Sequence, residues 1–260
     1  FLLYGSSSSA SDGSGPIIFE RRQNSSISYM SPVMSGFQVG ALVSVPGSGI
    51  TTVASTATVG KPRMYSLGAS YTNGPLFIAG AYESHTNFGT LNGTGSQKGT
   101  TDSGFMFGAA YQFGPVKLGG VYSKRNFDSG CNVQTATCLT GDASVASYGV
   151  NADWAIQGPH QLKVAYVHAN STTGSFGAPP PTSTGPVTTS LLVWNGGAGQ
   201  TGASLWEVEY LYNFSKRSRV SFGYVSLTQD AGARYNLGGF GQPIAGVTQN
   251  AFMTSLKSTF

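Results

Sequence analysis

The sequence predicts an all-β protein, specifically a transmembrane antiparallel up-and-down β-barrel, and three observations support that prediction. Only 9% of the 260 residues are charged, against about 25% in an ordinary soluble domain, whereas 37 residues are glycine and 13 are tyrosine. Apolar and polar residues alternate in many segments, and helical periodicity is sustained nowhere. The chain has no run of about 20 apolar residues, which excludes a helical membrane protein but suits the half-apolar strands of a barrel.

Eleven segments alternate with a period of two and are predicted as strands. They are bounded by glycine, proline, serine and asparagine, which favour turns. In chain order their ranges are 24–30, 37–45, 64–72, 76–85, 103–112, 116–125, 145–156, 161–170, 204–213, 219–228 and 250–260. We therefore divide the chain into an N-terminal segment, residues 1–23, and a barrel, residues 24–260.

The connections between these strands alternate strictly between short and long. SPVMSG, NGP, FGP, QGP and FSKR are short, and each strand pair that they join is followed by a much longer loop. This order is typical of an outer-membrane barrel, whose tight turns lie at one end and whose long loops lie at the other. A soluble sandwich with Greek-key crossings has no reason to keep it. A secreted β-sandwich or adhesin is the soluble alternative.

Charged residues share one face of the predicted strands. In LWEVEYLY, residues 205–212, the acids alternate with Trp206, Val208 and Tyr210, so they point to the opposite side. The mid-strand charges that follow this rule are Glu83, Lys117, Asp153, Lys163, Glu207, Glu209 and Lys257. Glycine and serine fill much of the remaining polar face, where a soluble surface would present more lysine and glutamate. We therefore predict that these charges line a water-filled lumen and that the apolar face contacts lipid.

Other chemistry finds little support in the sequence. Cys131 and Cys138 lack the spacing of a zinc knuckle, so a small loop-closing disulfide, formed in an oxidising compartment, is favoured over a metal site. The 14 basic residues are scattered, which argues against nucleic-acid binding. His85, His160 and His168 belong to no catalytic motif and are expected to be solvated or to lie at the membrane interface. Neither an enzyme nor a cofactor is predicted.

Several stretches resemble the trimeric general porins of Gram-negative bacteria, particularly those of β-proteobacteria. They are ERRQNSSISYMSPVMSGFQVGA, YSLGASYTNGPLFIAGAYE and YNFSKRSRVSFGYVSLTQDAGARYNLGG, of which the SKR turn followed by ARYN is the most specific. The resemblance implies a sixteen-stranded barrel for passive diffusion of ions and small hydrophilic solutes. It also implies a homotrimer, contacts with membrane lipid and lipopolysaccharide, and recognition of the terminal Phe260 during assembly.

The resemblance also gives a role to the segment before the first strand. It places Glu20, Arg21 and Arg22 near the narrowest part of the pore, where the electric field of charged side chains and the width of the opening select ions. It also implies a weak anion preference. This segment resembles the family's inward-folded third loop, so about five further strands are expected before it to close the wall. FLLYG resembles the family's first strand, so an N-terminal part that has been deleted or misassembled is the alternative. A barrel that holds a partner in its lumen is the alternative function.

Overall fold

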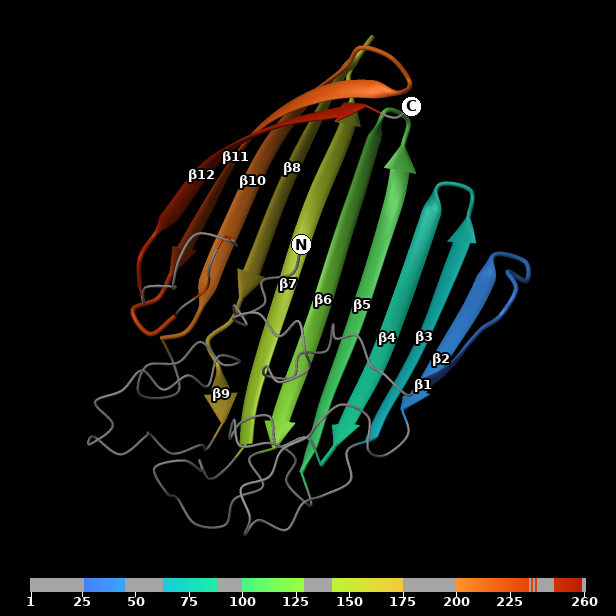
Figure 1. Ribbon diagram of the computed structural model, residues 1–260, viewed down its shortest axis with the longest axis vertical. Coiled ribbons are helices and arrows are strands. Elements are labelled where there is room, and N and C mark those ends of the chain that lie inside the picture. Colours follow the sequence, from blue (N-terminus) through green and yellow to red (C-terminus); the bar gives the residue numbers. More distant parts are fainter. Residues whose placement is uncertain are drawn as a thin grey trace.

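The computed structural model describes residues 26–44, 63–87, 100–128, 142–174, 200–233, 235, 237 and 246–258. Their strands form one sheet in which nearly every strand pairs with its neighbours in the sequence, and all pairs are antiparallel. Figure 1 shows a single curved layer of long, tilted strands whose tight turns lie together at the upper end. We call that edge the turn end and the opposite edge the loop end.

The eleven predicted strands are confirmed, and one short strand is added. The bounds are β1 (Ser26–Met30), β2 (Phe37–Ser44), β3 (Arg63–Asn73), β4 (Leu76–Thr86), β5 (Thr101–Phe113), β6 (Val116–Asp128), β7 (Asp142–Ala155), β8 (His160–Ala169), β9 (Thr173–Gly174), β10 (Ala203–Asn213), β11 (Ser218–Gln229) and β12 (Gln249–Ser258). The two-residue β9 lies off the main order and pairs with β7. From β3 onward the other strands have 10 to 14 residues, enough to cross a membrane when tilted.

Glycine–proline sequences make the tightest turns. Gly74 and Gly114 have φ angles of +54° and +55°, a left-handed conformation that glycine adopts without steric cost. Pro75 and Pro115 follow them, and a fixed φ with no N–H to satisfy suits a two-residue turn. Pairing continues up to both sides of each turn, so the turn fixes the register of its hairpin.

Buried apolar side chains gather at the loop ends of β8, β10 and β11. Val167, Leu205 and Leu227 are 3%, 7% and 0% exposed, and they pack with Ala233 and Tyr235 from the chain that follows β11. Large apolar residues elsewhere on the described strands are often exposed, as a surface in contact with lipid requires. The fold therefore has a local core at one end of a sheet rather than a central one.

Candidate functional site

The pairing register sorts the side chains into two faces. Directly opposite residues of an antiparallel pair point to the same side, and successive residues of a strand alternate. Trp206 is opposite Tyr166, and Val208 is opposite Val164 and Tyr224. We call this side the apolar face. Its exposed members run across the whole sheet and include Phe37, Leu67, Tyr82, Phe107, Leu118, Val150, Phe222 and Leu256.

Four predicted lumen residues form one continuous row on the other face. Lys117 is opposite Asp153, Asp153 is opposite Lys163, and Lys163 is opposite Glu209. We call this set the charged row and its side of the sheet the charged face. Opposite Cβ atoms in such pairs lie about 5 Å apart, so charges of alternating sign follow one another across β6, β7, β8 and β10. The arrangement presents a ladder of fixed charges near the turn end.

Small neighbours give the charged row room. Asp153 Oδ1 accepts a hydrogen bond of 2.6 Å from Gln161 Nε2, which orients the carboxylate. Gly119, one step along from Lys117 on the same face, is opposite Asn151, and a Cβ at Gly119 would lie 2.5 Å from the Asn151 Oδ1 atom. A larger residue at position 119 would therefore push the Asn151 amide away from the sheet. Glycine here keeps the wall thin beside the charges.

The remaining predicted lumen residues share this face but lie outside the row. Glu207 is opposite Ala165, next to Glu209 along β10. Lys257 is opposite Arg219, which the sequence analysis did not single out although its place in the alternation of β11 was visible. Two cations directly opposite each other repel, so this pair is a local concentration of positive charge at the turn end.

Glu83 lies on the charged face near the loop end, in a different environment. Its Oε1 atom is 2.7 Å from Nε2 of His85, which is only 1% exposed. The prediction of a hydrated His85 is therefore wrong, because the fold encloses the ring and local sequence does not reveal that enclosure. Asp102, opposite His85 on β5, is also fully buried, and Arg125 is 9% exposed on the same face. Sequence reasoning missed both of these buried charges.

Four charges near the loop end are exceptions to the separation of charge between the faces: Arg63, Lys124, Asp128 and Asp142. Lys124 is opposite Phe105 and Ala146, so it lies on the apolar face. Its position four residues from the loop end of β6 keeps it away from the middle of the strand. A charge at that depth costs far less than one at the bilayer centre.

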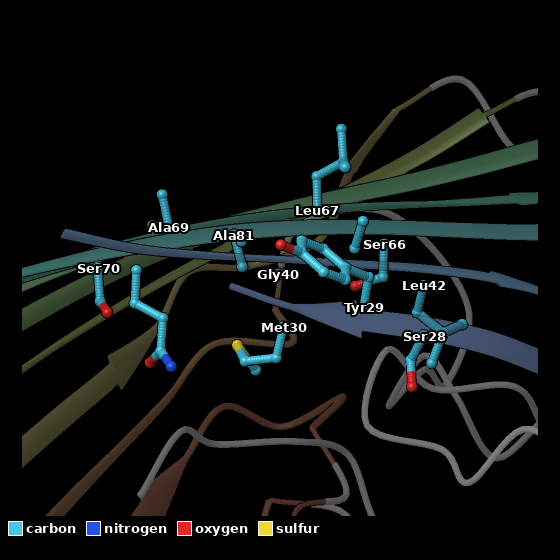
Figure 2. Close-up of a pocket in the computed structure, with 14 residues that line it drawn as sticks. Ser28, Tyr29, Met30, Gly40, Leu42, Ser66, Leu67, Ala69, Ser70 and Ala81 are labelled. Atoms are coloured by element: carbon cyan, nitrogen blue, oxygen red, sulfur yellow. The ribbon is translucent and has the colours of Figure 1, made fainter. Parts of the chain in front are cut away.

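Figure 2 shows the two faces at the first strands of the sheet. Leu67 and Ala69 point to one side of the strands, whereas Met30 and Ser70 point to the other. A hollow of about 410 Å³ lies here, with Gly40 among its lining residues. Serine, glycine and alanine leave this part of the wall open, in contrast to the charged row.

Several predicted site residues lie outside the described part of the chain. They are Glu20, Arg21, Arg22, Cys131, Cys138 and Phe260. Among the residues that the structure does describe, no three histidine, cysteine, aspartate or glutamate side chains come together in a way that could hold a metal ion. The described residues also contain no helix long and apolar enough to span a membrane.

The fold has clear structural relatives. The anion-selective porin of Comamonas acidovorans superposes with a TM-score of 0.62 at 18% identity, over 90% of this chain and 59% of that one. The trimer form of OmpT from Vibrio cholerae superposes with a TM-score of 0.55 at 15% identity, over 90% of this chain and 64% of that one. The outer membrane channel DcaP of Acinetobacter baumannii superposes with a TM-score of 0.52 at 10% identity, over 90% of this chain and 62% of that one. The chain thus spans about three fifths of the length of these structures. No curated protein sequence matches it.

The family comparison agrees with the geometry. The family described as Gram-negative porin matches residues 1–241, nearly the whole chain. The single antiparallel sheet, with an apolar and a charged face, is what such a barrel wall requires. The soluble β-sandwich alternative is therefore set aside. The chain belongs to the Gram-negative porin family.

Proposed function

We propose that the chain forms part of the wall of a water-filled channel through the outer membrane, for passive diffusion of ions and small hydrophilic solutes. The charged row supports this most directly, because its four side chains, those of Lys117, Asp153, Lys163 and Glu209, point away from the apolar face. Charges on that side are stable only if water reaches them, and apolar residues on the other side suit lipid. Transport then needs no chemical step, and the channel is not an enzyme.

We further propose a weak preference for anions. Within the described strands the charged face is balanced: its bases are Lys117, Arg125, Lys163, Arg219 and Lys257, and its acids are Glu83, Asp102, Asp153, Glu207 and Glu209. The preference therefore depends on the Glu20, Arg21 and Arg22 group, which adds one net positive charge at the proposed constriction. The Comamonas relative, described as anion-selective, supports this direction.

The remaining proposals concern assembly. Residues 1–23 contain the proposed constriction segment and residues 24–260 the barrel wall, which would be closed by further strands and would form a homotrimer, as the trimer form of OmpT suggests. We propose a disulfide between Cys131 and Cys138, recognition of Phe260 during assembly, and contacts of the apolar face with membrane lipid and lipopolysaccharide.

Planar-bilayer recording tests the channel function. The purified protein should give stepwise, ohmic conductance, and the reversal potential in a KCl gradient should have the sign of a modest chloride preference. Clear cation selectivity would contradict the anion preference alone. A folded protein that gives no conductance would contradict the channel and favour a barrel whose lumen holds a partner.

A further inference from the structure

Part of the charged face is neither charged nor open to water. At the loop ends of β8, β10 and β11 this face consists of Val167, Ala169, Ala203, Leu205, Val225 and Leu227, which we call the covered patch. Their side chains share a face with Lys163 and Glu209, and all are at most 7% exposed. Something inside the curve of the sheet therefore shields them from the lumen.

The chain after β11 provides that cover. Ala233 and Tyr235 are 0% and 4% exposed and belong to the same apolar cluster, and Leu237 packs against it. We call the described residues 230–233, 235 and 237 the covering segment. Since the covered patch lies on the charged face, the covering segment lies on that face too, rather than extending past the loop end.

Two glutamine side chains hold the covering segment at its centre. Gln229 Oε1 accepts a hydrogen bond from the Tyr235 backbone N–H at 2.7 Å, and Gln229 Nε2 donates to the Val247 carbonyl at 2.8 Å. Gln249 Nε2 donates to the Tyr235 carbonyl at 2.7 Å, and Gln249 Oε1 accepts from the Leu237 N–H at 3.3 Å. Both backbone polar groups of Tyr235 are thus satisfied by side chains from the ends of β11 and β12.

The first residues of the covering segment are fixed to the preceding loop end. Asp230 Oδ2 accepts hydrogen bonds from the Gly202 N–H at 2.9 Å and from Ser171 Oγ at 3.3 Å. The Gly232 N–H donates to the Gln200 carbonyl at 2.8 Å, and a Cβ at Gly232 would lie equally close to that oxygen. The contact is therefore built for glycine, which indicates a defined rather than an incidental path.

The covering segment also comes within electrostatic range of the far side of the face. Burial raises the pKa of the Tyr235 phenol, and the positive charge of Arg125 partly offsets that rise. Arg125 is on β6, four strands away from β11 along the sheet order β6-β7-β8-β10-β11. The segment thus lies over the charged face, on the side of β11 toward β6.

We propose that the covering segment is a second narrowing of the channel, near its loop end, with Tyr235 as the residue that anchors it. This inference rests on the proposed channel function. Withdrawal of the segment would expose Leu205, Val225 and Leu227 to water, which hydrophobic burial opposes, so the segment remains seated while solutes pass. The narrowing would limit solute size, because the segment takes up part of the cross-section there.

Single-channel recording of two variants tests the proposal. The double variant Gln229→Leu with Gln249→Leu removes four hydrogen bonds, two of them to the Tyr235 backbone, and Tyr235→Ala removes the anchoring side chain without altering a strand. Each should raise conductance at least about 1.5-fold, because ion flow follows the open cross-section. Heat-modifiable gel mobility would report whether each variant folds.

Gln112→Leu is the matched control. Gln112 lies on the charged face, near the turn end and opposite Lys117, so the same chemical change there should leave conductance within about a tenth of the original. Folded variants that conduct no more than the unaltered protein would overturn the second narrowing and leave the channel intact. An unaltered protein that does not conduct would overturn the proposed function and, with it, this inference.

Discussion

The charged face changes character along β8, β10 and β11. Near the turn end it presents Lys163, Glu209 and Arg219, whereas near the loop end it presents Val167 and Leu227. Leu211 is the buried apolar residue in the first region, between Gln161 and Ser221. The apolar face of these strands changes in the opposite sense, from Trp206 to the polar Ser204 and Thr228 at the loop end.

The difference shows that strand alternation alone does not decide what a face touches. Alternation puts side chains on a side, but the partner on that side is water near the turns and the protein's own chain near the loops. Charged groups that lack a partner require the first environment, because their burial is costly. Apolar groups gain free energy from the second, at roughly 25 cal/mol per Å² removed from water. One wall thus combines a water-lined surface with a local core.

The largest expected effect on stability comes from removing a side chain of the covered patch. Leu227→Ala should lower the free energy of unfolding by about 2 to 5 kcal/mol, because the side chain is fully buried and its loss leaves a cavity. Denaturant titration of the protein in lipid vesicles, followed by tryptophan fluorescence, would measure this change. Leu256→Ala is the control, since Leu256 is 76% exposed on the apolar face and lipid can fill the space it leaves. Equal losses for the two variants would contradict a packed patch at the loop end.

The contrast between the two faces can be tested at adjacent positions. Val208→Arg puts a cation on the apolar face near the middle of β10 and should cost about 2 to 4 kcal/mol of stability. Glu209→Arg puts the same side chain on the charged face, where the cost should stay below about 1 kcal/mol because water solvates it. The same vesicle titration would measure both. A larger loss at position 209 would mean that the faces have been assigned the wrong way round.

Reversing one charge of the charged row tests its proposed role in ion selectivity. Lys163→Glu would put an acid between Asp153 and Glu209, so that three acids lie side by side. Cation permeability relative to anions should rise at least about fivefold, since even one unit charge acts on an ion about 4 Å away in water with about 1 kcal/mol and this substitution changes the charge by two units. Reversal potentials in a KCl gradient would report the shift. Lys124→Glu makes the same change on the apolar face and should leave selectivity unchanged; an equal shift there would exclude a specific role for the row.

The sequence predicted those features of the fold that depend on neighbouring residues in the chain. The strands followed from alternation, and the glycine–proline turns fix hairpin registers such as the pairing of Gln112 with Lys117. The face of the seven mid-strand charges singled out in the sequence followed in the same way. The alignment of Lys117 with Asp153 did not, because residues 129–141 separate β6 from β7 and no short turn sets that register.

The covered patch was missed for a related reason. Val167, Leu205 and Leu227 share their face with charges, while Ser204, Ser226 and Thr228 lie beside them on the apolar face, and this reversal of the alternation was visible in the sequence. Apolar residues on the charged face signal that this face is covered at these strand ends. What covers the second face depends on a contact between distant parts of the chain, which periodicity within a strand does not contain. The enclosure of His85 escaped prediction for the same reason.

The smallest expected effect is a pH dependence, and it arises from the loop end of the charged face and not from its turn end. Because burial raises the pKa of Tyr235, the folded chain keeps the phenol proton at a pH where an unfolded chain, with an ordinary tyrosine pKa of 10.0, loses it. The contribution of Tyr235 to stability is therefore fully present below pH 10 and is lost as the pH rises through the raised pKa. Channel conductance should increase in that alkaline range as the covering segment loosens. Tyr235→Phe cannot ionise and should remove the increase, whereas an identical alkaline rise in that variant would show that Tyr235 does not hold the segment in place.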